Sequence, residues 1–467
     1  MLWHVDFHRR AFRLIIGRMD ARELANRICR TLREKGHQAY LVGGCVRDLL
    51  LGRQPADYDV ATDATPDDVQ RIFPRSLAVG AQFGVVVVTG DAADADDSAQ
   101  VEVATFRSDL GYSDGRHPDQ VRYSQRAEDD VQRRDFTINA LLLDPATNEV
   151  LDFVGGREDL RAGIIRAIGD AKHRLQEDKL RMMRAVRFAA RFHYAIDGGT
   201  FGAIRALAAQ IRQVSAERLR DELTKMLTEG AARQAFQLLD DTGLLAYVLP
   251  EIARMKGVEQ PPQFHPEGDV WAHTLLMLEG LQAGGSPTLA WGVLLHDVGK
   301  PPTFRAPSGS DGRIRFDEHV EVGTQMAIEI CRRLRFSNED TDQIAALVAN
   351  HLRFKDVPQM RASTLKRFVR LNRFEEHLEL HRLDCSSSHG HLDNYDFMRR
   401  FLAETAPEEV RPARVLTGED LKTLGFRPGP AFKEILDAVE DAQLNGKIRS
   451  RDEAVSFVED SFASLRE

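Results

Sequence analysis

Two aspartates separated by a single residue, Asp57 and Asp59, are the feature of the chain that most clearly suggests chemistry. They lie in DYDVAT, which alternates like a β-strand, so we expect both side chains to leave the same face. Two carboxylates this close repel each other unless a cation lies between them, and Mg²⁺ is the natural partner. Bound magnesium also takes substrate phosphates as ligands, which points to phosphoryl or nucleotidyl transfer. Taken alone, the pair is explained equally well by two solvated acids on an exposed edge strand.

A glycine pair upstream favours the catalytic interpretation. Gly43 and Gly44 stand between AYLV (39–42), which is typical of a buried strand, and the helix-like VRDLLLG. Glycines at such a junction let the backbone approach a ligand closely, and the start of the helix favours an anion such as a triphosphate. Arg47, followed by Asp48, lies in the first turn of that helix and can add a forked donor to phosphate. No G-x-x-x-x-G-K-[ST] motif occurs, which excludes a P-loop enzyme.

Histidines and aspartates in the second half of the chain form another candidate metal site. Neutral imidazoles combined with carboxylates suit a divalent transition metal that keeps open positions for an activated water. A lone histidine is more often a satisfied core residue, but an HD doublet inside WGVLLHDVGKP, preceded by WAHT, is hard to explain by packing. The doublet supplies His296 and Asp297, and WAHT supplies His273.

Together with Asp384, these residues form an H…HD…D pattern that resembles the HD superfamily of metal-dependent phosphohydrolases. His319 and His351 resemble the extra ligands of members that bind two metal ions. Lys300, at the end of HDVGK, either steadies a phosphate or is simply solvated. The resemblance implies phosphatase, 2′-nucleotidase or cyclic phosphodiesterase activity, although a domain kept only for structure would retain the same ligands.

Hydrophobic spacing predicts which elements position these residues. A helix over 20–35 and a capped helix starting at Thr65-Pro66-Asp67-Asp68 accompany strands at 39–42, 57–62, 84–88 and 101–106. Beyond residue 150 the strand signals fade, with Gly198-Gly199 and Gly243 as breaks between helices at 171–193, 201–212, 216–229 and 231–240. The acidic DAADADD is expected to be a solvated turn, and Thr417 to Asp420 a capping box in the tail. The expected fold class is α+β, a small α/β head followed by a long helical body.

Bulk composition is that of a globular, multidomain protein. The chain has 467 residues, is 43% hydrophobic and 29% charged, and carries a net charge of −9, so a nucleic-acid contact must be local. The four scattered cysteines favour a reducing, cytoplasmic setting, and no apolar run is long enough to span a membrane. The arginine-rich residues 1–19 are expected to be an N-terminal extension: a short helix, a segment upstream of a start at Met19, or a transit peptide.

The motifs together resemble class II nucleotidyltransferases of the tRNA CCA-adding and bacterial poly(A) polymerase group. LVGGCVRDLLLG with DYDVAT looks like the first motif of that group. RRDFTINAL (133–141) looks like the second, which implies ribose and triphosphate contacts by Arg134, Asp135 and Asn139. The resemblance covers nearly the whole chain beyond Met19 and implies a polymerase-β-like head. The expected domains are a head (20–150), a neck and body (151–255), an HD domain (256–395) and a tail (396–467).

Two further segments bear on the branch of the family. AVGAQFGVVVV (78–88) is similar to the tRNA-specific branch, because poly(A) polymerases usually carry a G-R-R-F-type signature there. FRSDLGYSDGRHPDQV (106–121) resembles the flexible loop next to the active site, or is a plain surface loop.

The stretch EDKLRMMRAVRF (177–188) is the candidate for choosing the nucleotide. Cytosine and adenine both present an amino donor beside a ring-nitrogen acceptor, whereas uracil and guanine present the reverse, so one acceptor beside one strong donor separates the two sets. Asp178 and Arg181, three apart on an expected helix, have that character, and Arg184 and Arg187 could continue toward the triphosphate. By spacing alone an ordinary ion pair between Asp178 and Arg181 is the better explanation. The E-D-x-x-R pattern of the family reverses that preference.

Two other features of this region support the assignment. Residues 157–191 hold ten Lys/Arg against five Asp/Glu, a local excess of positive charge where phosphates are expected to bind. On the same expected helix, an apolar strip should pack as core; its members are Leu180, Met183, Val186 and Ala190.

The hypothesis is therefore a Mg²⁺-dependent nucleotidyltransferase that adds C and A from CTP and ATP to the 3′ end of tRNA, fused to an HD unit that binds a transition metal. The alternatives are a partial enzyme that adds only CC or only A, a poly(A) polymerase, an HD phosphohydrolase whose head only binds RNA, and a noncatalytic RNA-binding protein. The sequence predicts no membrane contact.

Overall fold

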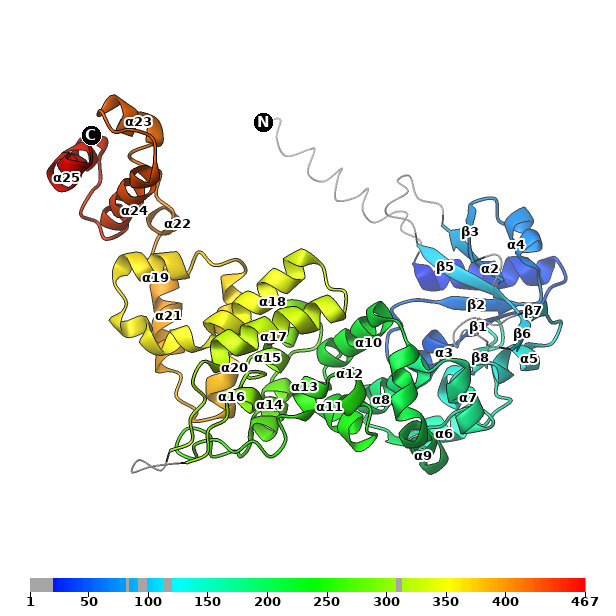
Figure 1. Cartoon of the computed structure of the whole chain (residues 1–467). Helices are drawn as coiled ribbons and strands as arrows, with labels where there is room; N and C mark the ends of the chain where they lie inside the picture. Colours follow the sequence, from blue (N-terminus) through cyan, green and yellow to red (C-terminus); the bar gives the residue numbers. More distant parts are fainter. Residues whose placement is uncertain (1–19, 81–83, 91–98, 112–119, 308–312, 467) are drawn as a thin grey trace, which may run out of the picture. The chain divides into compact units, whose positions relative to one another are not determined.

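The computed structural model describes residues 20–80, 84–90, 99–111, 120–307 and 313–466. Residues 1–19, the acidic turn at 91–97, and parts of the segments 78–88 and 106–121 that bear on the branch of the family lie outside the described residues. The described residues divide into two compact units, one comprising residues up to 226 together with 234–248, the other residues 227–233 together with those from 249 onward; Figure 1 draws the elements of both. Within the described residues, no helix has the length and apolar character needed to cross a bilayer.

A mixed sheet forms the head of the first unit. Among the described residues its strand order is β3-β4-β5-β2-β1-β8-β9, with β2 and β5 parallel and the other neighbours antiparallel. The valine-rich strands alternate buried and half-buried positions, as in β4, because one face packs on the core. The strands are β1 (Ala39–Val42), β2 (Asp59–Thr62), β3 (Ser76–Gly80), β4 (Val85–Thr89), β5 (Gln100–Thr105), β8 (Leu142–Leu143) and β9 (Val150–Leu151).

Helices flank this sheet where the sequence predicts them. Helix α2 (Ala21–Glu34) packs on the sheet through an apolar face that includes Leu24, Ile28 and Leu32. Helix α4 (Pro66–Ile72) starts with a complete capping box between Thr65 and Asp68, an arrangement that stabilises a helix start by about 1 kcal/mol. The other elements of the head are α3 (Gly44–Leu50), β6 (Arg107–Leu110), β7 (Gln120–Tyr123), α5 (Ala127–Gln132) and the 3-10 helix η3 (Thr137–Asn139).

The remainder of the first unit is mainly helical, with one short parallel pair, β10 (Ile164–Ile165) and β11 (Ala195–Ile196), which the sequence did not signal. The predicted break between helices is present at residues 193–197, just before Gly198 and Gly199, which instead form the first turn of α9 behind the N-cap Asp197. The helices are α6 (Gly156–Ala162), α7 (Ala171–Glu177), α8 (Leu180–Phe192), α9 (Gly198–Leu207), η4 (Ala208–Gln213), α10 (Ala216–Thr228), α11 (Ala232–Asp241) and α12 (Leu245–Val248).

The helix predicted over 171–193 is two helices, because the chain breaks at Asp178. The backbone of Asp178 is extended (φ −141°, ψ 106°), and its carboxylate accepts a hydrogen bond from the N–H of Leu180 at 3.0 Å. Aspartate competes with helical hydrogen bonding in this way, so α8 restarts immediately after it. The apolar strip of α8, which includes Leu180 and Met183, is buried as predicted.

From residue 249 onward, the named elements of the second unit are all helices. Its first part contains α13 (Pro250–Ala253), α14 (Val270–Glu279), α15 (Pro287–Leu295), α16 (Lys300–Thr303), α17 (His319–Arg333), α18 (Asn338–Asn350), η5 (His351–Gln359), α19 (Ala362–Phe368), α20 (Phe374–Ser387) and α21 (Asp393–Glu404). The tail contains α22 (Pro407–Val410), α23 (Gly418–Thr423), α24 (Pro430–Leu444), α25 (Arg451–Phe462) and η6 (Ala463–Leu465).

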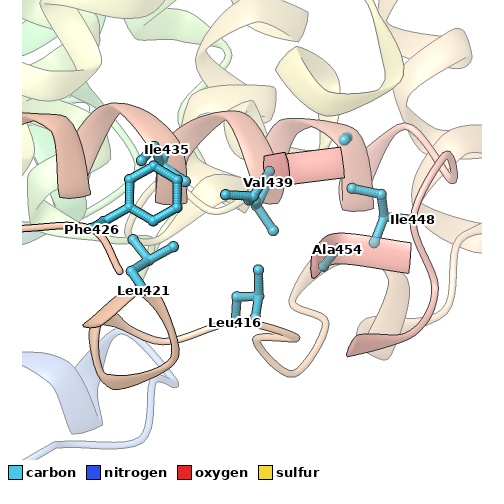
Figure 2. Close-up of a cluster of buried hydrophobic side chains, with 9 residues drawn as sticks. Leu416, Leu421, Phe426, Ile435, Val439, Ile448 and Ala454 are labelled. Carbon is cyan, nitrogen blue, oxygen red and sulfur yellow. The ribbon is translucent and has the colours of Figure 1, made fainter. Parts of the chain in front are cut away.

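The tail has a hydrophobic cluster of its own. Figure 2 shows side chains from α24, from α25 and from the segment around α23 turned toward one another, among them Leu421, Ile435 and Val439. The predicted capping box of α23, between Thr417 and Asp420, is present.

Candidate active site and candidate metal centre

A cavity of about 460 Å³ lies in the first unit, between the sheet and the helices that follow it. Six arginines and four aspartates line it, so carboxylates and guanidinium groups face the same space. All the predicted nucleotide-site residues except Asp48 and Arg187 lie on its wall. The lining residues are Gly43, Gly44, Arg47, Asp57, Asp59, Arg133, Arg134, Asp135, Asn139, Asp178, Leu180, Arg181, Arg184, Phe188 and Arg218.

The two candidate catalytic aspartates lie at the start of β2, a central strand that pairs with both β1 and β5, so the expected alternative of an exposed edge strand is wrong. Asp59 is the first residue of β2, and Asp57 precedes the strand rather than lying in it. Burial, the charge of Asp57 and the charge of Glu102 together raise the pKa of Asp59 to about 6. Glu102 is the register partner of Asp59 across β2 and β5. Three acids gathered in this way, with oxygen ligands and an elevated pKa, fit a bound divalent cation.

The backbone at the glycine pair is shaped by close approach. Gly43 has a φ of +79°, and a Cβ there would lie 3.3 Å from Nη1 of Arg134 and 3.9 Å from Oδ2 of Asp59. A side chain at this position would therefore fill the space between the carboxylates and the arginine.

Arg47 is held in place before any ligand arrives. Its Nε donates to Oδ1 of Asp48 at 2.9 Å, and its Nη1 donates to Oδ1 of Asn139 at 2.6 Å. The guanidinium carbon lies 4.6 Å from the ring centroid of Phe192. Asp48 is buried, and among the described residues it lies outside the cavity wall, so its contact with Arg47 is one of positioning.

The second motif contributes an aspartate and an arginine with separate partners. Burial raises the pKa of Asp135, but Arg184, Arg181 and a hydrogen bond from Asn139 bring it down to about 2. Nε of Arg184 donates to Asp135 at 2.8 Å. Nη2 of Arg134 lies 3.0 Å from Oδ2 of the buried Asp130, and this ion pair fixes the guanidinium group.

Asp178 and Arg181 do not pair with each other in the described part of the chain. Arg218 of α10 forks onto both carboxylate oxygens of Asp178, at 3.2 and 2.7 Å. Arg181 pairs with Glu177 at 2.5 Å and donates to the backbone carbonyl of Arg133 at 3.1 Å. The expected alternative, an i, i+3 ion pair between Asp178 and Arg181, is therefore wrong. Both residues line the cavity, and each is held by a different partner.

Arg187 lies elsewhere. It is buried, and its Nε donates to Glu222 of α10 at 2.7 Å. The guanidinium carbon lies 4.5 Å from the ring centroid of Phe188. These contacts connect α8 to α10, and Arg184 is the last arginine of the predicted series that lines the cavity.

The predicted H…HD…D residues come together in the second unit from α14, α15, α17, α20 and η5. His273, His296 and Asp384 form one group and Asp297, His319 and His351 another, with the potential ligand atoms of each group within 4.8 Å of one another.

The histidine nitrogens in these groups face carboxylates without forming hydrogen bonds. Nε2 of His273 lies 3.2 Å from Asp384, and Nε2 of His296 lies 3.1 Å from Asp297. Among the described atoms, Nε2 of both, and of His319 and His351, is buried without a hydrogen-bond partner. A buried nitrogen without a hydrogen-bond partner costs free energy. Four such nitrogens beside carboxylates therefore fit a bound divalent metal.

Positive groups around Asp297 keep its carboxylate ionised. Burial raises the pKa of Asp297, but His296 and Lys300 hold it well below its ordinary value. Burial lowers the pKa of His351 to about 4, which favours the neutral imidazole that metal binding needs. Burial also lowers the pKa of His273, but the neighbouring carboxylates of Asp384 and Glu267 raise it to about 9, so a metal bound there must displace a proton. Lys300 is buried and its Nζ lies 2.7 Å from Asp297, so the expectation of a simply solvated lysine is wrong.

The glycine of HDVGK allows two helices to meet. A Cβ on Gly299 would lie 2.1 Å from the carbonyl oxygen of His319 and 2.6 Å from the backbone N of Gly323. Only a glycine permits this approach, which brings α17 and its first residue, His319, to the centre.

Several residues of these sites were not anticipated from the sequence. Arg218 gave no local signal, because it lies 40 residues from Asp178. Glu102 could have been found as a lone acid in an otherwise apolar strand, VEVATF. Glu267, which contacts His273, stands in the HPEGD segment just before α14 and could have been noted as an acid close to WAHT.

Three family models match successive parts of the chain. The first, described as the poly A polymerase head domain, matches residues 39–166. The second, described as a probable RNA and SrmB-binding site of polymerase A, matches residues 193–256. The third is the HD domain, over residues 270–381.

Individual proteins match over nearly the full length. The CCA-adding enzyme of Geobacillus stearothermophilus is 32% identical over 434 residues, which cover 92% of this chain and 94% of the relative. The crystal structure of the Bacillus stearothermophilus CCA-adding enzyme in complex with CTP is 28% identical, with a TM-score of 0.70 and 96% and 98% of the two chains covered. The Thermotoga maritima CCA-adding enzyme complexed with tRNA, at 19% identity and a TM-score of 0.56, shares the fold over 96% and 98% of the two chains.

Proposed function

Because the chain belongs to the family of CCA-adding enzymes, we propose that it completes the 3′ end of tRNA by adding C, C and A from CTP and ATP without a nucleic-acid template. The observation that carries the proposal is the cavity in which two carboxylates, a set of arginines and the pair Asp178 and Arg181 face one space.

Asp57 and Asp59 would hold Mg²⁺, with Glu102 adding negative charge beside them. The ion supplies charge neutralisation at the triphosphate and lowers the pKa of the attacking tRNA hydroxyl. The residues of the chain orient the two reactants, because most of the catalysis in phosphoryl transfer is positioning and charge stabilisation.

Arginines that line the same cavity would bind the triphosphate and ribose. Arg47 and Arg134 are pre-oriented by Asp48 and Asp130, so little side-chain entropy is lost when phosphate oxygens replace water. Asn139, which accepts from Arg47, fits a contact to the ribose.

Base choice would rest on Asp178 as acceptor and Arg181 as donor. Asp178 would accept a hydrogen bond from the exocyclic amino group that C and A share, and Arg181 would donate a hydrogen bond to their ring nitrogen. Both groups are anchored by other residues, Arg218 and Glu177, so they can meet the base without first breaking a bond between themselves.

The decisive experiment is incubation of the full chain with tRNA that lacks one, two or all three terminal nucleotides. A complete CCA-adding enzyme restores all three substrates with CTP and ATP. Addition that stops after CC, or only a final A, would identify a partial enzyme, and long A tails on generic RNA a poly(A) polymerase. Asp57→Asn should abolish incorporation, and undiminished incorporation would reject the assignment.

We propose a second activity, metal-dependent phosphohydrolysis, at the HD centre, because four histidine nitrogens and two carboxylates converge there. His273, His296, Asp297 and Asp384 would hold a transition metal, and His319 and His351 a second ion. The metal supplies an activated water. His296→Ala should remove hydrolysis of cyclic or terminal phosphates and leave nucleotide incorporation intact; loss of both activities would contradict two independent sites.

The division of the chain is likewise proposed as a head (20–150), a neck and body (151–255), an HD domain (256–395) and a tail (396–467). The three matched family models support the order of the first three. A cytoplasmic location stays a prediction.

A further inference from the structure

The four histidines of the HD centre are held in two different ways. Nδ1 of His296, His319 and His351 lies 2.8, 2.8 and 2.6 Å from the backbone carbonyls of Val293, Phe316 and Val348. Each of these carbonyls belongs to the residue three positions earlier, so main chain supplies the acceptor: Val293 and Val348 are helical, and Phe316 stands just before α17. A proton on Nδ1 is therefore fixed by main chain, and Nε2 is left with its lone pair toward the centre.

His273 is the exception, because a side chain supplies its acceptor. Its Nδ1 lies 2.7 Å from Oε1 of Glu267, while its Nε2 lies 3.2 Å from Asp384. His273 is completely buried, and the side chain of Glu267 is only 7% exposed. A buried carboxylate close to a buried imidazole interacts more strongly than the same pair would in water.

Hydrogen bonds of Asp269 hold the segment that carries Glu267 in place. Asp269, two residues later, caps α14 by accepting from the N–H of Ala272 at 2.7 Å, and it also accepts from the N–H of Gly257 at 2.6 Å. The segment that carries Glu267 is thereby tied to the start of the helix that carries His273. Among the described residues, no Lys or Arg forms an ion pair with Glu267. No permanently charged side chain therefore neutralises its carboxylate.

We propose that Glu267 is a positioning residue of the HD centre, which fixes the tautomer and ring orientation of His273 so that Nε2 can bind the metal. The inference rests on the metal-binding function proposed for this centre. A carboxylate behind a metal-bound histidine holds its ring and increases its basicity, which strengthens metal binding.

The neighbouring His265 raises an alternative, in which His265, Glu267 and His273 bind an ion of their own. Distances argue against it. Nδ1 of His265 and Nδ1 of His273 lie 2.8 and 2.7 Å from the same Oε1, which are hydrogen-bond lengths. Two ligands about 2.1 Å from one tetrahedral ion are separated by roughly 3.4 Å. The contacts from His273 to Asp384 and from His296 to Asp297, at 3.2 and 3.1 Å, are closer to that spacing.

The test is Co²⁺ binding to the metal-free full chain, followed by visible absorption and by competition with a chelator. Glu267→Ala should weaken Co²⁺ binding about 10- to 100-fold, the usual effect of removing a residue behind a metal ligand. Its absorption bands should also shift, because the ring of His273 is no longer oriented. Glu267→Gln should lose less, since an amide oxygen can still accept from Nδ1.

Glu376→Gln is the matched control. Glu376 is also a half-buried acid of this unit, but its oxygens accept from Ser286, Thr288 and Gln343 rather than from a candidate ligand. This variant should bind Co²⁺ like the wild type. Nucleotide incorporation should be unchanged in every variant, which verifies that the first unit is folded, and an unchanged helical circular-dichroism signal verifies the fold of the second unit.

Three outcomes would overturn the inference. Glu267→Ala that binds Co²⁺ as tightly as the wild type, while His296→Ala binds weakly, shows that the carboxylate has no positioning role. His265→Ala that loses as much affinity as Glu267→Ala shows that these residues ligate an ion themselves. If His296→Ala also binds normally, the proposed metal centre itself fails, and the inference fails with it.

Discussion

Replacing Asp59 by asparagine should abolish nucleotide addition and yet stabilise the metal-free head. Folding places this carboxylate in a half-buried position beside Asp57 and Glu102, which raises its pKa from an ordinary 3.8 to about 6. A folded-state pKa above the unfolded one means that the deprotonated acid destabilises the native state. The penalty is absent below pH about 4, grows between pH 4 and 6, and is complete above pH 6. At 1.36 kcal/mol per pH unit, it amounts to about 3 kcal/mol at neutral pH.

Amide hydrogen exchange of β1, β2 and β5 measures this free energy locally, without assuming that the two units unfold together. In excess chelator at pH 7.5, Asp59→Asn should slow exchange in these strands by about 100-fold relative to the wild type. The difference should vanish near pH 4. Mg²⁺ should stabilise the wild type and not the variant.

Asp57→Asn provides the comparison. Asp57 is exposed and contributes only repulsion, so its replacement should slow exchange much less than Asp59→Asn does. If Asp59→Asn exchanges as fast as the wild type, or faster, at pH 7.5 without metal, neither burial nor the neighbouring acids destabilise the Asp59 carboxylate, and the reasoning is refuted.

Further predictions concern the supports of the two sites. Arg218→Met releases the carboxylate of Asp178, so KM for CTP and ATP should rise about tenfold and discrimination against UTP should fall, as measured by single-nucleotide incorporation. Asp135→Asn should cost about 2 kcal/mol of stability at pH 7, because the pKa of Asp135 is depressed to about 2; in denaturant unfolding across pH, the loss should shrink below pH 4 as the wild type becomes protonated. Gly299→Ala should push α17 away through a clash with Gly323, and Co²⁺ titration should show greatly weakened binding.

Each of these predictions has an outcome that contradicts it. Arg220 is a matched arginine of α10 that pairs with the exposed Asp221, and Arg220→Met should leave nucleotide choice unchanged. An equal effect of Arg218→Met and Arg220→Met would mean that only the helix was disturbed. A stability difference for Asp135→Asn that does not depend on pH, or tight Co²⁺ binding by Gly299→Ala, would show that these contacts matter less than the structure implies.

Most of the chain's local structure was predictable, because hydrophobic periodicity and capping signals act within a few residues. The strand at 39–42, the helix after it and the capping boxes at Thr65 and Thr417 were all identifiable in this way. The break at Asp178 was not, since the apolar spacing continues across it and only the side-chain bond to Leu180 interrupts the helix.

The sequence by itself indicated which chemistry to expect: the spaced carboxylates, the glycine pair and the HD doublet are local patterns whose residue types point to phosphate and metal binding. Tertiary structure alone decided how those groups are held. Arg218 holds Asp178, Glu222 removes Arg187 from the cavity, and Glu267 supports His273. Side chains pair through space, across separations such as the 40 residues between Asp178 and Arg218 and the 92 residues between Arg47 and Asn139. A local pattern contains no information about which elements packing will bring together.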